Sequence, residues 1–134
     1  MIVVDTSVLI AILLAEPEKD AFIEYIVDHP TAHLSAVSLQ EAGMIMRSRR
    51  GETGVDDLYE LAEVLGIRVE AYDTPHVRRA IDAFARFGKG MGSPARLNFG
   101  DCAAYALAAT LSLPLLYKGD DFAATDIPRA AVIV

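Results

Sequence analysis

Four segments of this 134-residue chain each carry an acidic side chain after an apolar run or at the start of a predicted helix. These acids are Asp5, Glu41, Asp101 and the adjacent Asp120 and Asp121. In an open α/β sheet, ligands bind in the crevice outside the carboxyl ends of the parallel strands, so acids from distant segments can meet there. Carboxylates that meet repel one another until a divalent cation enters. The spacing therefore indicates a metal site, one that acts on phosphate.

Each acid also has an ordinary structural explanation. Asp5, followed by Thr6 and Ser7, suits a helix N-cap. Glu41 in the first turn of a helix complements the helix dipole, and Asp101 can cap the helix that follows it. The acids indicate a site only as a set, because one end of a parallel sheet can gather all of them.

Short apolar strands and amphipathic helices must position these acids. We expect strands at residues 2–4, 33–34, 67–71, 115–117 and 132–134. We expect helices over 6–14, from Pro17 to 28, from a cap at Ser35 or Ser38 up to Gly51, over 55–65, from Thr74 and over 102–111, with Gly51 and Gly54 separating the third from the fourth. Apolar strands that alternate with helices predict an α/β fold with a mostly parallel sheet covered on both faces.

The composition limits the class of protein. A chain of 134 residues with 53% hydrophobic content fits one domain, residues 1–134, and has no apolar run of about 18 residues or more that would suggest a membrane span. The apolar run that ends at Asp5 lacks a basic leader, so we expect a cytoplasmic protein. The single cysteine, Cys102, cannot form an internal disulfide, and we expect it to be buried without a catalytic role.

The net charge of −7 argues against a nucleic-acid substrate at first sight. The positive charges, however, are clustered. One cluster comprises Arg47, Arg49 and Arg50, and a second comprises Arg78, Arg79, Arg86, Lys89 and Arg96. Two local basic surfaces are therefore available to a phosphate backbone, although solvated helix faces explain them equally simply.

Four segments together resemble a known family. They are Val4–Ser7, Ser38–Glu41, Leu97–Ala108 and Leu116–Asp126. These segments are similar to the motifs of PIN-domain ribonucleases, and more specifically to those of VapC-type toxins of toxin–antitoxin pairs. The resemblance runs through the chain in order, and the last two segments are its most specific part.

This resemblance implies a three-layer α/β/α sandwich and a Mg²⁺-dependent endoribonuclease, with Mn²⁺ as the alternative cation. It implies a toxin that a cognate antitoxin protein holds inactive, and a homodimer. Catalysis would use a water activated by the metal, and the products would carry a 5′-phosphate and a 3′-hydroxyl. His29, His33 and His76 lack the spacing of a histidine-pair ribonuclease, and we expect them at the surface or at helix caps.

The resemblance also implies roles for individual residues. Asp5 and Asp101 would be direct metal ligands, and Glu41 would complete the acid cluster. The fourth acid would be Asp121, with Asp120 as the alternative. The supporting or phosphate-binding residues would be Thr6, Ser7, Asn98 and Asp126.

Two other classes of function remain open. A phosphomonoester hydrolase of the haloacid-dehalogenase type also begins with an apolar strand that ends in Asp, and Lys118-Gly119-Asp120 fits its later motif loosely. That family has a second acid two residues after the first, where this chain has Ser7. The other alternative is a nonenzymatic binding scaffold of PIN-like shape, against which the intact set of acids argues.

Overall fold

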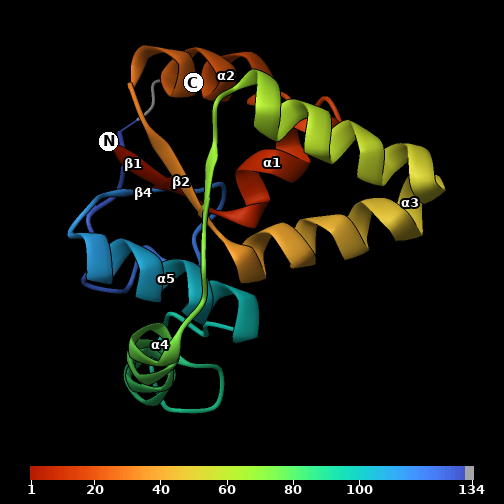
Figure 1. Ribbon diagram of the computed structural model, residues 1–134. Coiled ribbons are helices and arrows are strands. Elements are labelled where there is room, and N and C mark those ends of the chain that lie inside the picture. Colours follow the sequence, from red (N-terminus) through yellow and green to blue (C-terminus); the bar gives the residue numbers. More distant parts are fainter. Residues whose placement is uncertain (132–134) are drawn as a thin grey trace.

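A four-stranded parallel sheet lies at the centre of the part of the chain described by the computed structural model, residues 1–131 (Figure 1). The strands are β1 (Ile2–Val4), β2 (Ala32–Ser35), β3 (Arg68–Glu70) and β4 (Leu115–Leu116), in the order β3-β2-β1-β4. All three neighbouring pairs are parallel. The expected strand at 132–134 lies outside the described residues.

The central strand, β1, shows why these apolar runs form strands. Its residues are all buried, and they alternate between two cores on opposite faces of the sheet. Ile2 and Val4 belong to one core, while Val3 belongs to the other. A strand buried on both faces needs a continuous β-branched run, which is the pattern at residues 2–4.

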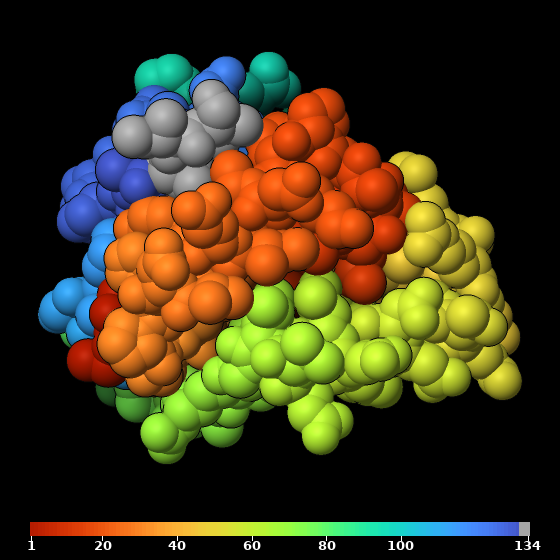
Figure 2. Space-filling view, turned by 90° about the horizontal axis from the view of Figure 1, so that it is seen from above, coloured from red at the N-terminus to blue at the C-terminus, as the bar shows by residue number. Residues whose placement is uncertain are grey.

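Helices cover both faces of the sheet, as the expected three-layer α/β/α sandwich requires (Figure 1). On one face lie α1 (Thr6–Leu13), α2 (Lys19–Asp28) and α3 (Ala36–Val64), and on the other lie α4 (Thr74–Phe87) and α5 (Phe99–Leu111). Seen from above, α2 and the second arm of α3 form much of one outer surface (Figure 2).

The predicted separation of two helices is found at Gly51 but not at Gly54. Helix α3 consists of two helical arms that meet in a sharp turn at Gly51, whose φ of 66° and ψ of −151° are not helical. Gly54 lies within the second arm, where a methyl group would clash with the backbone of Met46. Glycine is therefore needed at 54 for close packing of the two arms, not for separating them.

Other differences concern element ends. Helix α2 begins at Lys19 rather than at Pro17, and β3 is shorter than the predicted 67–71. Helix α4 begins at Thr74 as predicted, with the Asp73 side chain accepting a hydrogen bond from the amide of His76. None of the helices in residues 1–131 is long and apolar enough to cross a membrane.

Two of the three histidines are not at the surface. His33 and His76 are buried, and Nδ1 of His33 lies 3.1 Å from a carboxylate oxygen of Glu70. The expectation of a surface or cap position is therefore wrong for His33, which lies in strand β2, whereas His76 is in the first turn of α4 and its amide donates to the capping Asp73. Cys102 is buried and free, as predicted.

Candidate functional site

The site begins at Asp5, where β1 ends and α1 starts. Its carboxylate accepts hydrogen bonds from the amide of Ser7 at 3.0 Å and from the Ser7 hydroxyl at 2.6 Å, so Asp5 is the N-cap of α1. The Asp5 residue is only 5% exposed. The capping interpretation is thus correct, but one buried carboxylate can cap a helix and also face a ligand.

Ser7 links Asp5 to the segment after β4. The Ser7 hydroxyl accepts a hydrogen bond from the amide of Lys118 at 3.0 Å while it donates to Asp5. Ser7 therefore orients Asp5 and also fixes the start of the loop that carries Asp120 and Asp121. Thr6 is turned elsewhere, because its hydroxyl donates to the carbonyl of Ser38 in the first turn of α3.

Asp101 occupies the first turn of α5, and a capping box holds it there. The Asn98 side chain accepts a hydrogen bond from the amide of Asp101 at 2.8 Å, and the Asp101 carboxylate accepts one from the amide of Asn98 at 3.0 Å. This reciprocal arrangement satisfies two helix amides that would otherwise lack partners. It holds the Asp101 carboxylate in place at the start of α5.

The pKa values of Asp5 and Asp101 show that neighbouring acids affect one another. Burial raises the pKa of Asp5 to about 6, against the two Ser7 hydrogen bonds that lower it, and the charge of Glu41 adds to the rise. Burial also raises the pKa of Asp101 to about 7, and the charges of Asp5, Asp121 and Glu41 add to it. The charges of carboxylates at the end of β1, in α3, in α5 and in the loop after β4 therefore act on one another.

Glu41 lies against the start of α5. A methyl group at Gly100 would clash with the Glu41 carboxylate, so glycine at this position leaves the space that the carboxylate occupies. Sequence reasoning did not single out Gly100. Its signal in the sequence is its place directly before an acid in the first turn of a helix, and many helices share that pattern.

We predict that Gly100→Ala displaces the Glu41 carboxylate without weakening the fold, because alanine favours a helix by about 1 kcal/mol over glycine. If the site is catalytic, turnover should fall roughly tenfold, the scale of losing a group that orients a ligand. Enzyme kinetics and thermal melting check this. Gly43→Ala in α3 is the matched control, since its methyl group would make ordinary contact with Leu58 at 3.7 Å; equal kinetics for the two variants would refute the role of Gly100.

Asp120 and Asp121 differ in their effect on Asp101. Asp121 is among the charges that raise the pKa of Asp101, and this favours Asp121 as the fourth acid. Asp126 takes part in another group: its carboxylate accepts a hydrogen bond from the Tyr105 hydroxyl at 2.5 Å and one from Arg86 at 2.8 Å. Its place is beside α4 and α5, and sequence reasoning missed both of its partners.

The residues present fit a magnesium ion of the kind that keeps most of its water. Within residues 1–131, no three His, Cys, Asp or Glu side chains are arranged to hold a metal ion by themselves. Mg²⁺ is commonly bound through one or two carboxylates, with water and substrate phosphate completing its octahedron. Asp5 and Asp101 provide two buried carboxylates whose charges repel each other, and a cation between them would relieve that repulsion.

Comparisons with known proteins agree with this architecture. The model of the PIN domain family matches residues 2–128. The chain is 42% identical over 128 residues to "Ribonuclease VapC28" of Mycobacterium tuberculosis, covering 96% of each chain. The chain belongs to the VapC ribonucleases of the PIN-domain family.

Solved structures of a toxin and of a toxin–antitoxin complex share the fold. The crystal structure of Mycobacterium tuberculosis VapC20, a toxin that cleaves the sarcin-ricin loop, superposes with a TM-score of 0.79 at 17% identity, covering 97% of this chain and 98% of that one. A toxin–antitoxin complex from Klebsiella pneumoniae matches with a TM-score of 0.70 at 16% identity, covering 94% of this chain and 93% of that one. At these identities the likeness establishes the fold of this VapC ribonuclease.

Proposed function

We propose that this VapC ribonuclease is the toxin of a toxin–antitoxin pair and a Mg²⁺- or Mn²⁺-dependent endoribonuclease. One nuclease domain, residues 1–134, would act on RNA in the cytoplasm. The observation that carries the proposal is that Asp5, Glu41, Asp101 and Asp121 act on one another: burial raises the pKa of Asp5 to about 6 and that of Asp101 to about 7, and the charges of neighbouring acids add to both rises. Such raised values are typical of sites where a charged ligand is missing.

In this proposal Asp5 and Asp101 hold the cation, which when bound would polarise a phosphate oxygen and activate a water molecule. Ser7 holds the Asp5 carboxylate in place through its hydrogen bond of 2.6 Å, and Asn98 does the same for Asp101 through the capping box. In the same proposal Glu41 and Asp121 would orient the attacking water and accept its proton.

One contact argues against the phosphomonoester hydrolase. That reading needs Lys118 to face the acids, but the Lys118 ammonium lies 2.8 Å from a carboxylate oxygen of Glu16 and 3.1 Å from one of Glu18. Hydrogen bonds to Glu16 and Glu18 also raise the pKa of Lys118. Lys118 is thus paired with two acids of the segment between α1 and α2.

The test is incubation of the purified chain, free of antitoxin, with a pool of labelled RNAs in Mg²⁺ or Mn²⁺. We expect internal cuts that disappear with EDTA and no release of phosphate from a monoester. Phosphate release from the monoester alone would support the phosphatase. No turnover of either substrate would support the nonenzymatic scaffold.

We further propose that the antitoxin binds along two hollows that meet on α3. The first, of about 580 Å³, lies between the two arms of α3 and includes Leu39, Met44 and Tyr59. The second, of about 590 Å³, shares Gln40 and Met44 with the first and reaches Glu41. An extended segment that follows both hollows would pass the acid cluster, where an arginine would pair with carboxylates.

Tyr59→Ala is expected to weaken antitoxin binding at least tenfold, because Tyr59 is 57% exposed in the first hollow and exposed aromatic residues are frequent binding hot spots. RNA cleavage should be unchanged, since Tyr59 belongs to the second arm of α3 and not to the acid cluster. Calorimetric titration with the antitoxin encoded beside the toxin measures the affinity. Val64→Ala, an exposed residue of the same arm, is the control; equal affinities for both variants would contradict this binding route.

We propose that the homodimer forms through an apolar face of α4 and the start of α5. Val77, Ile81 and Phe84 follow helical spacing on α4 and line a hollow of about 370 Å³ together with Phe99. Phe99 is 77% exposed and Ile81 is 64% exposed. Large exposed apolar patches of this kind mark interaction sites.

Ile81→Asp should convert the dimer to a monomer, because it places an unpaired charge in the centre of the proposed interface. Sedimentation at micromolar concentration measures the change. Val27→Asp, which alters an equally exposed residue on α2, should leave the dimer intact. A monomeric wild-type chain would remove the basis for this interface.

A further inference from the structure

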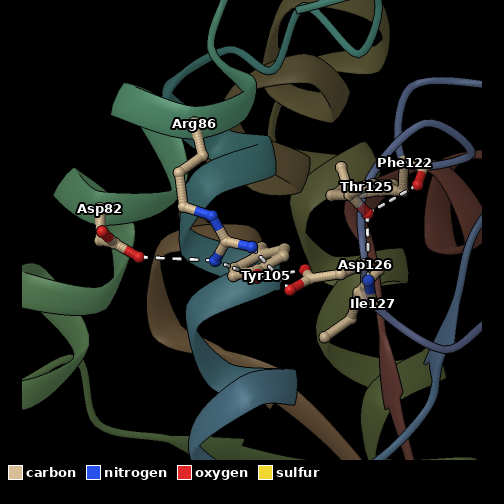
Figure 3. A network of polar contacts seen from close by, with 7 residues as sticks. All are labelled: Asp82, Arg86, Tyr105, Phe122, Thr125, Asp126 and Ile127. Carbon is tan, nitrogen blue, oxygen red and sulfur yellow. Dashed lines mark hydrogen bonds and ion pairs between the residues drawn. The ribbon is translucent and has the colours of Figure 1, made fainter.

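The loop that carries Asp121 is fixed at both of its ends. We define this acidic loop as residues 118–127. At its start, the amide of Lys118 donates to the Ser7 hydroxyl at 3.0 Å. At its end, the Asp126 carboxylate accepts hydrogen bonds from the Tyr105 hydroxyl at 2.5 Å and from Arg86 Nη2 at 2.8 Å (Figure 3).

Internal contacts make the acidic loop a compact unit. Phe122 is 2% exposed, and its ring lies 5.0 Å from that of Tyr117. The Thr125 hydroxyl donates to the carbonyl of Phe122 at 2.7 Å and accepts from the amide of Ile127 at 3.3 Å (Figure 3). A constraint on Asp126 therefore also restricts the turn that contains Asp121.

Tyr105 connects this loop to the helix of Asp101. The two residues are four apart on α5, so their side chains project from the same side of that helix in successive turns. Tyr105 is buried, and its hydrogen bond to Asp126 joins residues that are 21 apart in sequence. The helix that carries one acid of the cluster thus holds the loop that carries another.

We propose that Tyr105, Asp126 and Arg86 form a clamp that positions Asp121 against Asp101. The inference rests on the proposed nuclease function and adds three positioning residues to it. Hydrogen bonds from Tyr105 and Arg86 lower the pKa of Asp126, so this carboxylate stays charged and keeps both partners at neutral pH. Tyr105 contributes more than Arg86, because Tyr105 is buried and its contact with Asp126 is partly buried, whereas the ion pair between the Arg86 and Asp126 side chains, 46% and 55% exposed, is screened by water.

The variants Tyr105→Phe and Asp126→Ala and their double variant test the clamp. We expect kcat on RNA to fall roughly tenfold in each single variant with KM nearly unchanged, because substrate binding does not require the clamp. The double variant should be no slower than Tyr105→Phe, since both changes remove the same contact. Hydrogen–deuterium exchange of the acidic loop, without RNA or cation, should become faster in all three.

Asp82→Asn is the matched control. Asp82 lies 3.6 Å from Arg86 on α4 but does not reach the acidic loop (Figure 3), so its variant should keep wild-type exchange and kcat. Because Asp126 is exposed, Asp126→Ala keeps the test open if Tyr105→Phe fails to fold. Unchanged loop exchange, or unchanged kcat with faster exchange, would overturn the clamp. A wild-type chain that cleaves no RNA would instead overturn the proposed function. Because the exchange measurement needs no RNA, it tests the clamp separately from that function.

Discussion

Asp101→Asn should abolish cation-dependent RNA cleavage, with a loss of at least about 100-fold, because a cation at this site supplies several kcal/mol of transition-state stabilisation. Asp5→Asn should behave in the same way. Both changes keep an oxygen that can accept the capping hydrogen bonds, so the fold should persist. Cleavage rates under single-turnover conditions measure the loss.

The stability of the Asp101→Asn variant provides an independent readout. Because the folded chain raises the pKa of Asp101 from 3.8 to about 7, the folded state binds this proton more tightly than the unfolded state does. The free energy of unfolding of the wild-type chain without cation should therefore fall as pH rises from about 4 through about 7. Above about pH 7 this group should cause no further loss. Asp101→Asn removes this loss, so it should melt at a higher temperature than wild type at about pH 8, with the difference vanishing near pH 4.

Asp56→Asn, at an exposed acid in the second arm of α3, is the control for both readouts. It should change neither cleavage nor the pH dependence of melting. Full activity of Asp101→Asn and Asp5→Asn would refute their assignment as ligands of the cation.

Cation affinity should depend steeply on pH. Since Asp5 and Asp101 have pKa values of about 6 and about 7 without cation, both are largely protonated near pH 5 and must lose protons to bind Mn²⁺. Affinity should rise by up to about 100-fold per pH unit below both values and level off above about pH 7.5.

Calorimetric titration of the chain with Mn²⁺ at several pH values checks this dependence, and titration in buffers of different ionisation enthalpy counts the protons released. In Asp101→Asn the slope should fall by one proton. Affinity that stays constant from about pH 5 to about pH 8 would contradict cation binding by these two carboxylates.

The sequence was informative where function depends on local geometry. Asp5 follows a buried strand and Asp101 begins a helix, and the structure has both acids at these positions, Asp5 as the N-cap of α1 and Asp101 in the first turn of α5. The parallel sheet and its two covered faces followed from apolar strands that alternate with helices. Asp5 caps α1 and is also a candidate metal ligand, so the two interpretations of this residue do not exclude each other.

Contacts between distant segments were beyond sequence reasoning. The link between Tyr105 and Asp126 depends on where the loop after β4 turns, and neither residue type announces the other. The space that Gly100 leaves for Glu41 depends on how closely α3 approaches α5. The choice between Asp120 and Asp121 likewise depends on one turn of backbone, and only the effect of Asp121 on Asp101 separates them.

The chemistry of the cut ends tests the central claim most directly. An RNA that the wild-type chain cleaves in Mg²⁺ or Mn²⁺ is analysed at both new ends, beside the same RNA with a 2′-deoxy nucleotide at the cut site. The account predicts a 5′-phosphate and a 3′-hydroxyl, and cleavage of both substrates, because the nucleophile is water. A 5′-hydroxyl with a 2′,3′-cyclic phosphate, and resistance of the 2′-deoxy substrate, would contradict it.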